Sequence, residues 1–317
     1  MANFRRSKTK KLAFFAVLVF VVVFMSIGYS LINVQLNLTA TANLYASKDF
    51  LWYKIINDFR PQNLQQVSYE NNKYAYVGNN VDNYVQFEGT LWRIISIESD
   101  NTIKLMNTTP VVYSFDNTEN RTSSSTYCID LENGCNSWSQ QTNLVNGDIN
   151  GSVENNSSLL NALNPTVYNS FSSDGQNKLV LHDFHVGAVQ DQSTLQSIIA
   201  QEQAIIWNGY VGLPNLSDYM FSQSGNMNST ITGTYNSYMY EYSSFGYQLT
   251  LNPLYNDSSK IWAITPNQSH NTIYAKESSI EEDQVNKNVN TFIVIYLNSN
   301  VKYASGDGSQ QNPYILQ

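Results

Sequence analysis

The sequence predicts an α+β fold in which a single N-terminal transmembrane helix precedes a β-rich ectodomain. Basic residues followed by a long apolar run mark the N-terminus. Alternation in the first segment and strand-like composition in the next two, with turn residues between them, then indicate three short strands between residues 84 and 106. Beyond them, segments with helical spacing are followed by a strand-like segment and by a short apolar run that is typical of a buried strand. Strands and helices in this irregular order are typical of the α+β class.

Residues 12–32 form the predicted membrane anchor. The run has 21 residues, and a bilayer core takes about 20 apolar residues as a helix. Every charge in residues 1–11 is positive, which makes this segment a cytoplasmic tail and places the C-terminal part outside the cell. A cleaved signal peptide is the alternative, but its apolar core is usually about 7–15 residues long and ends at a small-x-small site. A pilin-type stem is a third interpretation. Pilins carry an acidic residue early in the apolar helix, whereas no acidic residue occurs before Asp49 in this chain.

The charge of the chain excludes some partners. Five of its 17 basic residues lie in the first 11 positions, so the remainder has 12 basic and 25 acidic residues. A segment this acidic repels phosphate backbones, and we expect no nucleic-acid partner. Charged residues make up only 13% of the chain and Tyr is abundant. Such a surface suits a cell-surface protein that contacts carbohydrate, although AT-rich codon usage gives the same composition.

The domain prediction places a stalk at residues 33–70 and the ectodomain at residues 71–317. A short helix is expected at residues 47–59, capped by Ser47 and stopped by Pro61. The ectodomain opens with a β-meander whose strands are residues 84–87, 91–97 and 103–106. Both faces of the middle strand are mostly apolar, so we expect it to be central in its sheet.

Residues 107–157 are rich in Asn, Ser and Thr and read as a long loop excursion. A functional loop and a tolerated insertion both fit this length. The excursion contains the two cysteines of the chain, Cys128 and Cys135. Outside the cell such a pair is expected to form a disulfide. No His lies nearby to complete a metal site, and the spacing is wider than the C-x-x-C of redox proteins.

Two helices and two strands are predicted in the rest of the chain. The first helix spans residues 157–167, is capped by Ser157 and breaks at Pro165. The second begins at Thr194 and carries apolar residues at helical spacing up to Ile206, ending near residue 208. Residues 261–264 and 292–297 read as strands, the latter buried.

Five sequence blocks occur in order at residues 83–95, 160–168, 207–219, 261–266 and 296–314. They are an N-Y-V-x-F…W-R-I-I opening, a Leu-Asn…Tyr helix, a W-x-G-x-x-G-L…S-D-Y block, a W-x-I-x-P strand and a Y-L-x-S-x-V…G-D-G-x-x-x-N-P-Y ending. In this order the blocks resemble an uncharacterised family of surface proteins from Gram-positive (Bacillota) gut bacteria. The resemblance covers most of residues 75–317.

The resemblance implies a surface protein, and its Trp-rich pattern implies a C-type-lectin-like or sulfatase-modifying-factor-like scaffold. It transfers no activity, because the family has none established and a fold does not define a function. One departure stands out. The family has Arg-Pro before the final Tyr-Leu strand, whereas this chain has residues 290–295, Asn-Thr-Phe-Ile-Val-Ile.

The block at residues 207–219 supplies the candidate ligand-binding residues Trp207, Asp218 and Tyr219. On a lectin-like scaffold, the carboxylate would hydrogen-bond a sugar and the rings would stack on it. The alternative is that both aromatic residues belong to the core and that Asp218 caps a turn. Large aromatic side chains are usually buried, which favours the alternative.

The sequence gives no positive support for an enzyme, and no catalytic residue, metal or cofactor is predicted. His182 and His185 form its only His cluster, and a third ligand at suitable spacing is missing. The Asp307 segment lacks the oxygen-rich repeat of a calcium loop. No nucleophile elbow, phosphate-binding loop or dinucleotide fingerprint occurs.

We therefore expect a membrane-anchored cell-surface protein that binds carbohydrate or a host-surface protein. A cell-envelope enzyme acting on glycans and a structural surface component are the alternatives. Converging carboxylates in a pocket would favour the enzyme, and an exposed aromatic platform would favour binding.

Overall fold

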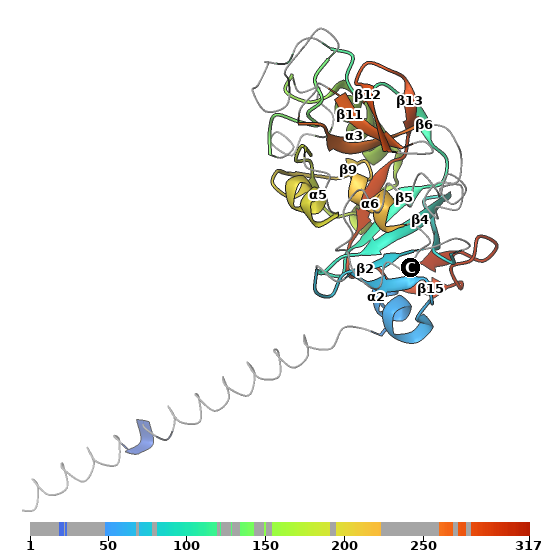
Figure 1. The fold of residues 1–317 in the computed structure, drawn as a ribbon. Helices are drawn as coiled ribbons and strands as arrows, with labels where there is room; N and C mark the ends of the chain where they lie inside the picture. The colour runs from blue at the N-terminus through green and yellow to red at the C-terminus, as the bar shows by residue number, and fades with distance from the viewer. Residues whose placement is uncertain are drawn as a thin grey trace, which may run out of the picture. The chain divides into compact units, whose positions relative to one another are not determined.

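The computed structural model describes residues 19–21, 23, 48–67, 70–77, 81–118, 121, 128, 134–142, 149, 154–190, 195–222, 260–268, 272–276 and 280–317. The chain divides into two compact units, Met1–Lys48 and Asp49–Gln317 (Figure 1). Among the described residues no helix has the length and apolarity needed to cross a bilayer. Most of the predicted anchor, residues 12–32, lies outside them, as does the predicted cap Ser47.

The folded unit begins before the boundary predicted at residue 71. A helical segment consisting of α2 (Leu51–Tyr53) and the π-helix η1 (Lys54–Phe59) is present as expected. It ends at Phe59, and the C-cap Arg60 precedes Pro61. Leu51 and Ile55 are fully buried in the main core. Residues four apart on a helix share a face, so this face seals the core and the segment is no stalk.

The largest sheet within the described ranges has nine strands and contains the predicted meander. Its main path runs β15-β16-β3-β4-β5-β14-β9, and β1 and β2 attach through β4. As predicted, β4 is central, since it pairs with β2, β3 and β5. The strands are β1 (Leu64–Gln66), β2 (Tyr74–Tyr76), β3 (Tyr84–Phe87), β4 (Thr90–Ile97), β5 (Ile103–Asn107), β9 (Val211–Gly212), β14 (Val294–Leu297), β15 (Tyr303–Ser305) and β16 (Tyr314–Leu316).

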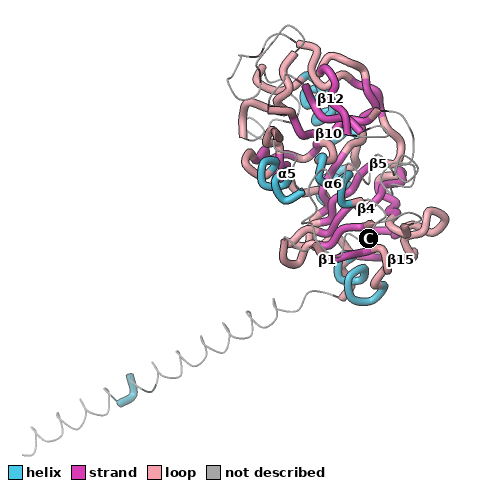
Figure 2. The backbone as a smooth tube through the Cα atoms, viewed as in Figure 1, coloured by secondary structure: helices cyan, strands magenta, loops and turns pink. Residues whose placement is uncertain are grey.

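The described residues also form two smaller sheets, and Figure 2 draws the strands in magenta beside the helices in cyan. A five-stranded sheet has the order β12-β11-β10-β13-β6, and β7 pairs with β8. These strands are β6 (Val111–Tyr113), β7 (His182–His185), β8 (Ile206–Gly209), β10 (Ile261–Pro266), β11 (Thr272–Lys276), β12 (Ile280–Gln284) and β13 (Val289–Thr291). The strand predicted at residues 261–264 is β10, and the buried strand predicted at residues 292–297 is β14. All residues of both strands are buried.

The first predicted helix continues through its proline. Helix α3 (Ser158–Ser170) has Ser157 at its N-cap, as expected, but Pro165 lies inside it. A proline in a helix interior costs about 3 kcal/mol. Helix α3 also buries Leu159, Leu160 and Leu163, and each fully buried Leu contributes about 1.5–3 kcal/mol. The packing of this face outweighs the cost, and the predicted break was wrong.

The second predicted helix is shorter than expected. Helix α5 (Leu195–Glu202) ends six residues before the predicted end, and the short α4 (Ser173–Lys178) and α6 (Leu216–Phe221) are the other helices described near it. Ile206 belongs to β8, where exposed and buried residues alternate. The apolar pattern at Ile206 and Trp207 fits both a helix and a strand. These residues form a strand because they pair with β7.

The Ser157 cap gives a test of the α3 boundary. The Ser157 hydroxyl accepts a hydrogen bond from the Leu160 N–H at 3.1 Å. Replacing an N-cap Ser by Ala removes this bond and typically costs about 1 kcal/mol. We expect Ser157→Ala to lower the free energy of unfolding by this amount in urea titration. Ser170→Ala, at the exposed far end of α3, should change it by less than about 0.5 kcal/mol.

The predicted disulfide joins Cys128 and Cys135, whose Cα atoms are 4.9 Å apart. Closing a loop of this length stabilises the fold by about 2.5 kcal/mol in the chain-entropy account. Replacing both cysteines by Ser should lower the free energy of unfolding by a similar amount, measured by urea titration. A reductant should destabilise the native protein and leave the Ser variant unchanged. Equal stabilities of the two proteins would show that the disulfide contributes nothing.

Candidate functional site

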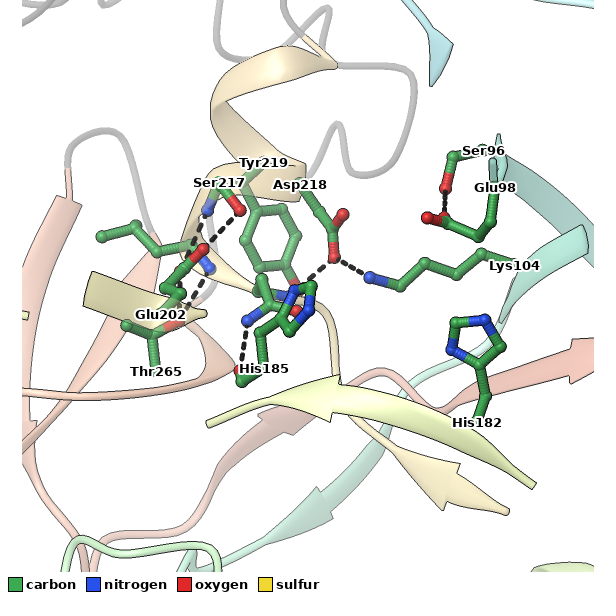
Figure 3. A network of polar contacts seen from close by, with 12 residues as sticks. Ser96, Glu98, Lys104, His182, His185, Glu202, Ser217, Asp218, Tyr219 and Thr265 are labelled. Atoms are coloured by element: carbon green, nitrogen blue, oxygen red, sulfur yellow. Dashed lines mark hydrogen bonds and ion pairs between the residues drawn. The ribbon is translucent and has the colours of Figure 1, made fainter. Parts of the chain in front are cut away.

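A small pocket lies where the largest sheet meets β7, α5 and α6 (Figure 3). Its volume is about 40 Å³, which holds a few water molecules or one polar group of a ligand. The lining residues Asp183 and Gln203 are exposed, so the pocket reaches solvent there. Its inner wall carries charged side chains, which makes it the candidate functional site of the described chain.

Strand register brings three polar side chains of the site together. Lys104 on β5 is opposite Ser96 on β4 and opposite Tyr296 on β14. Directly paired residues of adjacent strands project to the same face of a sheet, so these three form a row across it. The Lys104 ammonium lies 5.7 Å from the centre of the Tyr296 ring, within the range of a cation–π contact.

Lys73 and Glu98 form one ion pair of the pocket. The Lys73 ammonium is 2.8 Å from the Glu98 carboxylate, which also accepts a hydrogen bond from the Ser96 hydroxyl at 2.5 Å. Burial alone would raise the pKa of Glu98. Attraction to Lys73 and Lys104, with the hydrogen bonds from Lys73 and Ser96, outweighs burial and lowers this pKa to about 2. Glu98 is therefore a fixed negative charge at physiological pH.

Lys104 and Asp218 form the second ion pair. Their side chains are 5% and 11% exposed, and Nζ lies 2.6 Å from Oδ2. The same Asp218 oxygen accepts a hydrogen bond at 2.8 Å from the backbone N–H of Asn215, the N-cap of α6. The Asn215 amide donates to the His185 carbonyl at 2.6 Å. These contacts tie α6 to both β5 and β7.

Glu202, at the end of α5, is a buried carboxyl group held by hydroxyl groups. Ser217 and Thr265 each donate a hydrogen bond to it at 2.5 Å. No ion pair of Glu202 occurs within the part of the chain that the structure describes. Burial raises the pKa of Glu202 to about 7, the Asp218 charge adds to this, and the hydrogen bonds only partly offset it. Glu202 and Glu98 thus differ in protonation at neutral pH.

The two histidines of the pocket lie in β7 rather than on a helix. The His182 ring stacks on Tyr296 with 3.8 Å between ring centres, and its Nε2 is 3.6 Å from the Asp100 carboxylate. Burial, together with Lys73 and Lys104, lowers the pKa of His185 to about 4, so His185 is neutral at physiological pH. Within the described ranges, no three His, Cys, Asp or Glu residues gather in a way that would hold a metal.

The structure separates the three predicted ligand-binding residues. Trp207 and Tyr219 are fully buried in the core, and the Tyr219 hydroxyl donates to the Trp262 carbonyl at 3.3 Å. Neither ring has a face open for stacking on a sugar in this structure. Asp218 does line the pocket, although its carboxylate is engaged by Lys104.

Most residues of the pocket are not predicted from the sequence. Ser96 and Lys104 interrupt apolar strands, and Glu202 falls at helical spacing among the apolar residues of α5. Because a polar residue at a core position needs a partner, this pattern was an available signal. The hydrogen-bond and ion-pair partners of these polar residues come from distant segments of the chain, and the sequence alone does not show which residues meet.

No protein-family model, curated protein or solved structure matches this chain. The fold and the site define an α+β protein with a pocket of paired, buried charges.

Proposed function

We propose that this chain is a single-pass, membrane-anchored bacterial cell-surface protein whose folded unit, residues 49–317, binds carbohydrate or a host-surface protein. The N-terminus would be cytoplasmic and the folded unit extracellular, as the basic residues before the apolar run favour. The acidic composition beyond residue 11 supports a soluble exterior part. A lectin-like relationship stays part of this proposal.

The pocket favours carbohydrate as the ligand, and it is the observation that carries the proposal. A sugar hydroxyl both donates and accepts hydrogen bonds. The Lys73 ammonium and the Glu98 carboxylate offer a donor and an acceptor side by side. Both groups are held in place before a ligand arrives, which lowers the entropy cost of binding. A volume of about 40 Å³ takes one hydroxyl or hydroxymethyl group, with the rest of the sugar outside.

A glycan array tests the proposal. We expect residues 49–317 to bind a restricted set of glycans. Gln203→Arg places a bulky cation at the exposed rim and should weaken binding about tenfold, since losing about 1.4 kcal/mol has this effect. Gln190→Arg makes the same change at an exposed position outside the pocket lining and should bind as the native protein does. Absence of binding to every glycan would contradict a carbohydrate ligand and leave a host-surface protein.

Membrane anchoring needs a separate test. We expect the full chain to stay with the membrane fraction after alkaline extraction, and protease added to intact cells to remove residues 49–317. Release of the protein by alkali, or protection from the protease, would contradict the proposed location.

A glycan-acting enzyme is the second candidate because the pocket holds two carboxyl groups with opposite pKa displacements. The pKa of Glu98 is lowered to about 2 and that of Glu202 is raised to about 7. Glycoside hydrolysis uses such a pair, with one carboxyl group ionised and one protonated. Mass analysis of glycans incubated with the protein would reveal cleavage products. Products that disappear in Glu98→Gln would favour the enzyme, and intact glycans would favour binding alone.

A further inference from the structure

The Lys104–Asp218 pair joins two segments that are distant in sequence. The residues are 114 positions apart and lie on β5 and α6. The separation of 2.6 Å between Nζ and Oδ2 is at the short end for a charge-assisted hydrogen bond. Asp218 is the only ion-pair partner of Lys104 in the described part of the chain. The amine and the carboxylate are therefore in direct contact in the folded protein.

The surroundings hold these groups in place and limit their contact with water. The two side chains are 5% and 11% exposed. Tyr296, which is 4% exposed, lies beside the amine. The Asn215 N–H donates to the same carboxylate oxygen that Lys104 contacts. An amine and a carboxyl group kept in contact react far faster than the same groups free in solution. Folding has already removed the translational and rotational entropy that free groups lose when they come together.

We propose that Lys104 and Asp218 condense into an amide that cross-links β5 to α6. A proton passes from the ammonium to the carboxylate, and the free Nζ attacks Asp218 Cγ. The new C–N bond forms, one C–O bond breaks, and the released oxygen leaves as water with two hydrogens from Lys104. The ion pair has the composition of the amide plus one water, so no oxidant, reductant or other reactant is needed.

A neighbouring carboxyl group supports this reaction. Glu202 contacts Ser217, the residue before Asp218, and the charge of Asp218 contributes to its raised pKa. Glu202 therefore lies close enough to interact with the reacting carboxyl group and retains its proton near neutral pH. Attack by an amine places negative charge on an oxygen of the carboxyl group, and a protonated carboxyl group nearby stabilises that charge. Glu202 is a positioning residue in this account.

The mass of the full-length chain tests the cross-link without any variant. After denaturation and reduction in detergent, we expect a mass lower than the sequence mass by one water. Trypsin should fail to cut after Lys104, and residues 94–121 should be found joined to residues 179–260. In Lys104→Arg, which keeps the charge but forms no such amide, the full mass should return.

Two results would overturn the cross-link. One is the full sequence mass with normal cleavage after Lys104, which would leave the pair as an ion pair. The other is a water loss located elsewhere, for example as a succinimide at Asp307-Gly308. The inference goes beyond the proposed ligand binding and does not depend on it, because the mass is measured without a glycan.

Discussion

Replacing Asp116 by Ala is expected to destabilise the folded unit more than any other change considered. Asp116 and Arg121 form an ion pair at 2.7 Å with both side chains fully buried. Asp116 also accepts hydrogen bonds from the backbone N–H groups of Cys135 at 2.7 Å and Ser158 at 3.1 Å. Breaking a buried pair leaves an uncompensated charge and typically costs about 3–5 kcal/mol. Urea titration of residues 49–317 measures this change.

An exposed ion pair supplies the matched control. Asp174 pairs with Lys178 one helical turn away, and its side chain is 79% exposed. Asp174→Ala should cost less than about 1 kcal/mol because solvent screens such pairs. Adding Arg121→Met to Asp116→Ala should recover part of the loss, since it removes the unpaired charge. If Asp116→Ala lowers the free energy of unfolding no more than Asp174→Ala does, the stabilising role assigned to the Asp116–Arg121 pair is contradicted.

Glu202→Gln is expected to become increasingly stabilising, relative to the native protein, as pH rises. The unfolded carboxyl group titrates near 4.5, and burial raises the folded pKa to about 7. Between these values the folded state keeps a proton that the unfolded state has lost, so stability falls with rising pH. The shift corresponds to about 3 kcal/mol. The Gln variant cannot titrate and escapes this loss.

The free energy of unfolding of Glu202→Gln has to be compared with that of the native protein at each pH, because other groups titrate in the same range. His185 acts with the opposite sign over an overlapping range, because its pKa is lowered to about 4 and only the unfolded state binds the proton. Glu98 contributes at lower pH, where its stabilisation is lost as pH falls through about 2. Urea titrations at pH 5 and pH 8 should show the difference for Glu202→Gln and none for the exposed Glu154→Gln. A difference that does not change with pH would contradict the raised pKa.

Local patterns in the sequence predicted much of the fold. The meander, the buried C-terminal strands and the cap at Ser157 all depend on neighbouring residues, which a sequence displays directly. The predictions that were wrong concern segments whose secondary structure depends on tertiary packing. Burial of the leucines of α3 outweighs the cost of Pro165, and pairing with β7 turns Ile206 into a strand residue.

The site was less predictable than the fold. Trp207 and Tyr219 attract attention in a sequence, but the structure buries both. The pocket instead depends on the contact between Lys104 and Asp218, which are 114 residues apart in the sequence. Only the three-dimensional arrangement of β5 and α6 creates that proximity. The sequence signal was the presence of charged residues at otherwise apolar positions.

The imidazole signals of His182 and His185 give the most direct test that the pocket is the ligand site. Both histidines line the pocket, and the signals of each are assigned by its replacement with Gln. Nuclear magnetic resonance spectra of residues 49–317 would be recorded while a glycan selected on the array is added. Both histidine signals are expected to shift and to saturate together as the glycan binds. Saturable binding that leaves both signals unmoved would place the ligand elsewhere and contradict the account.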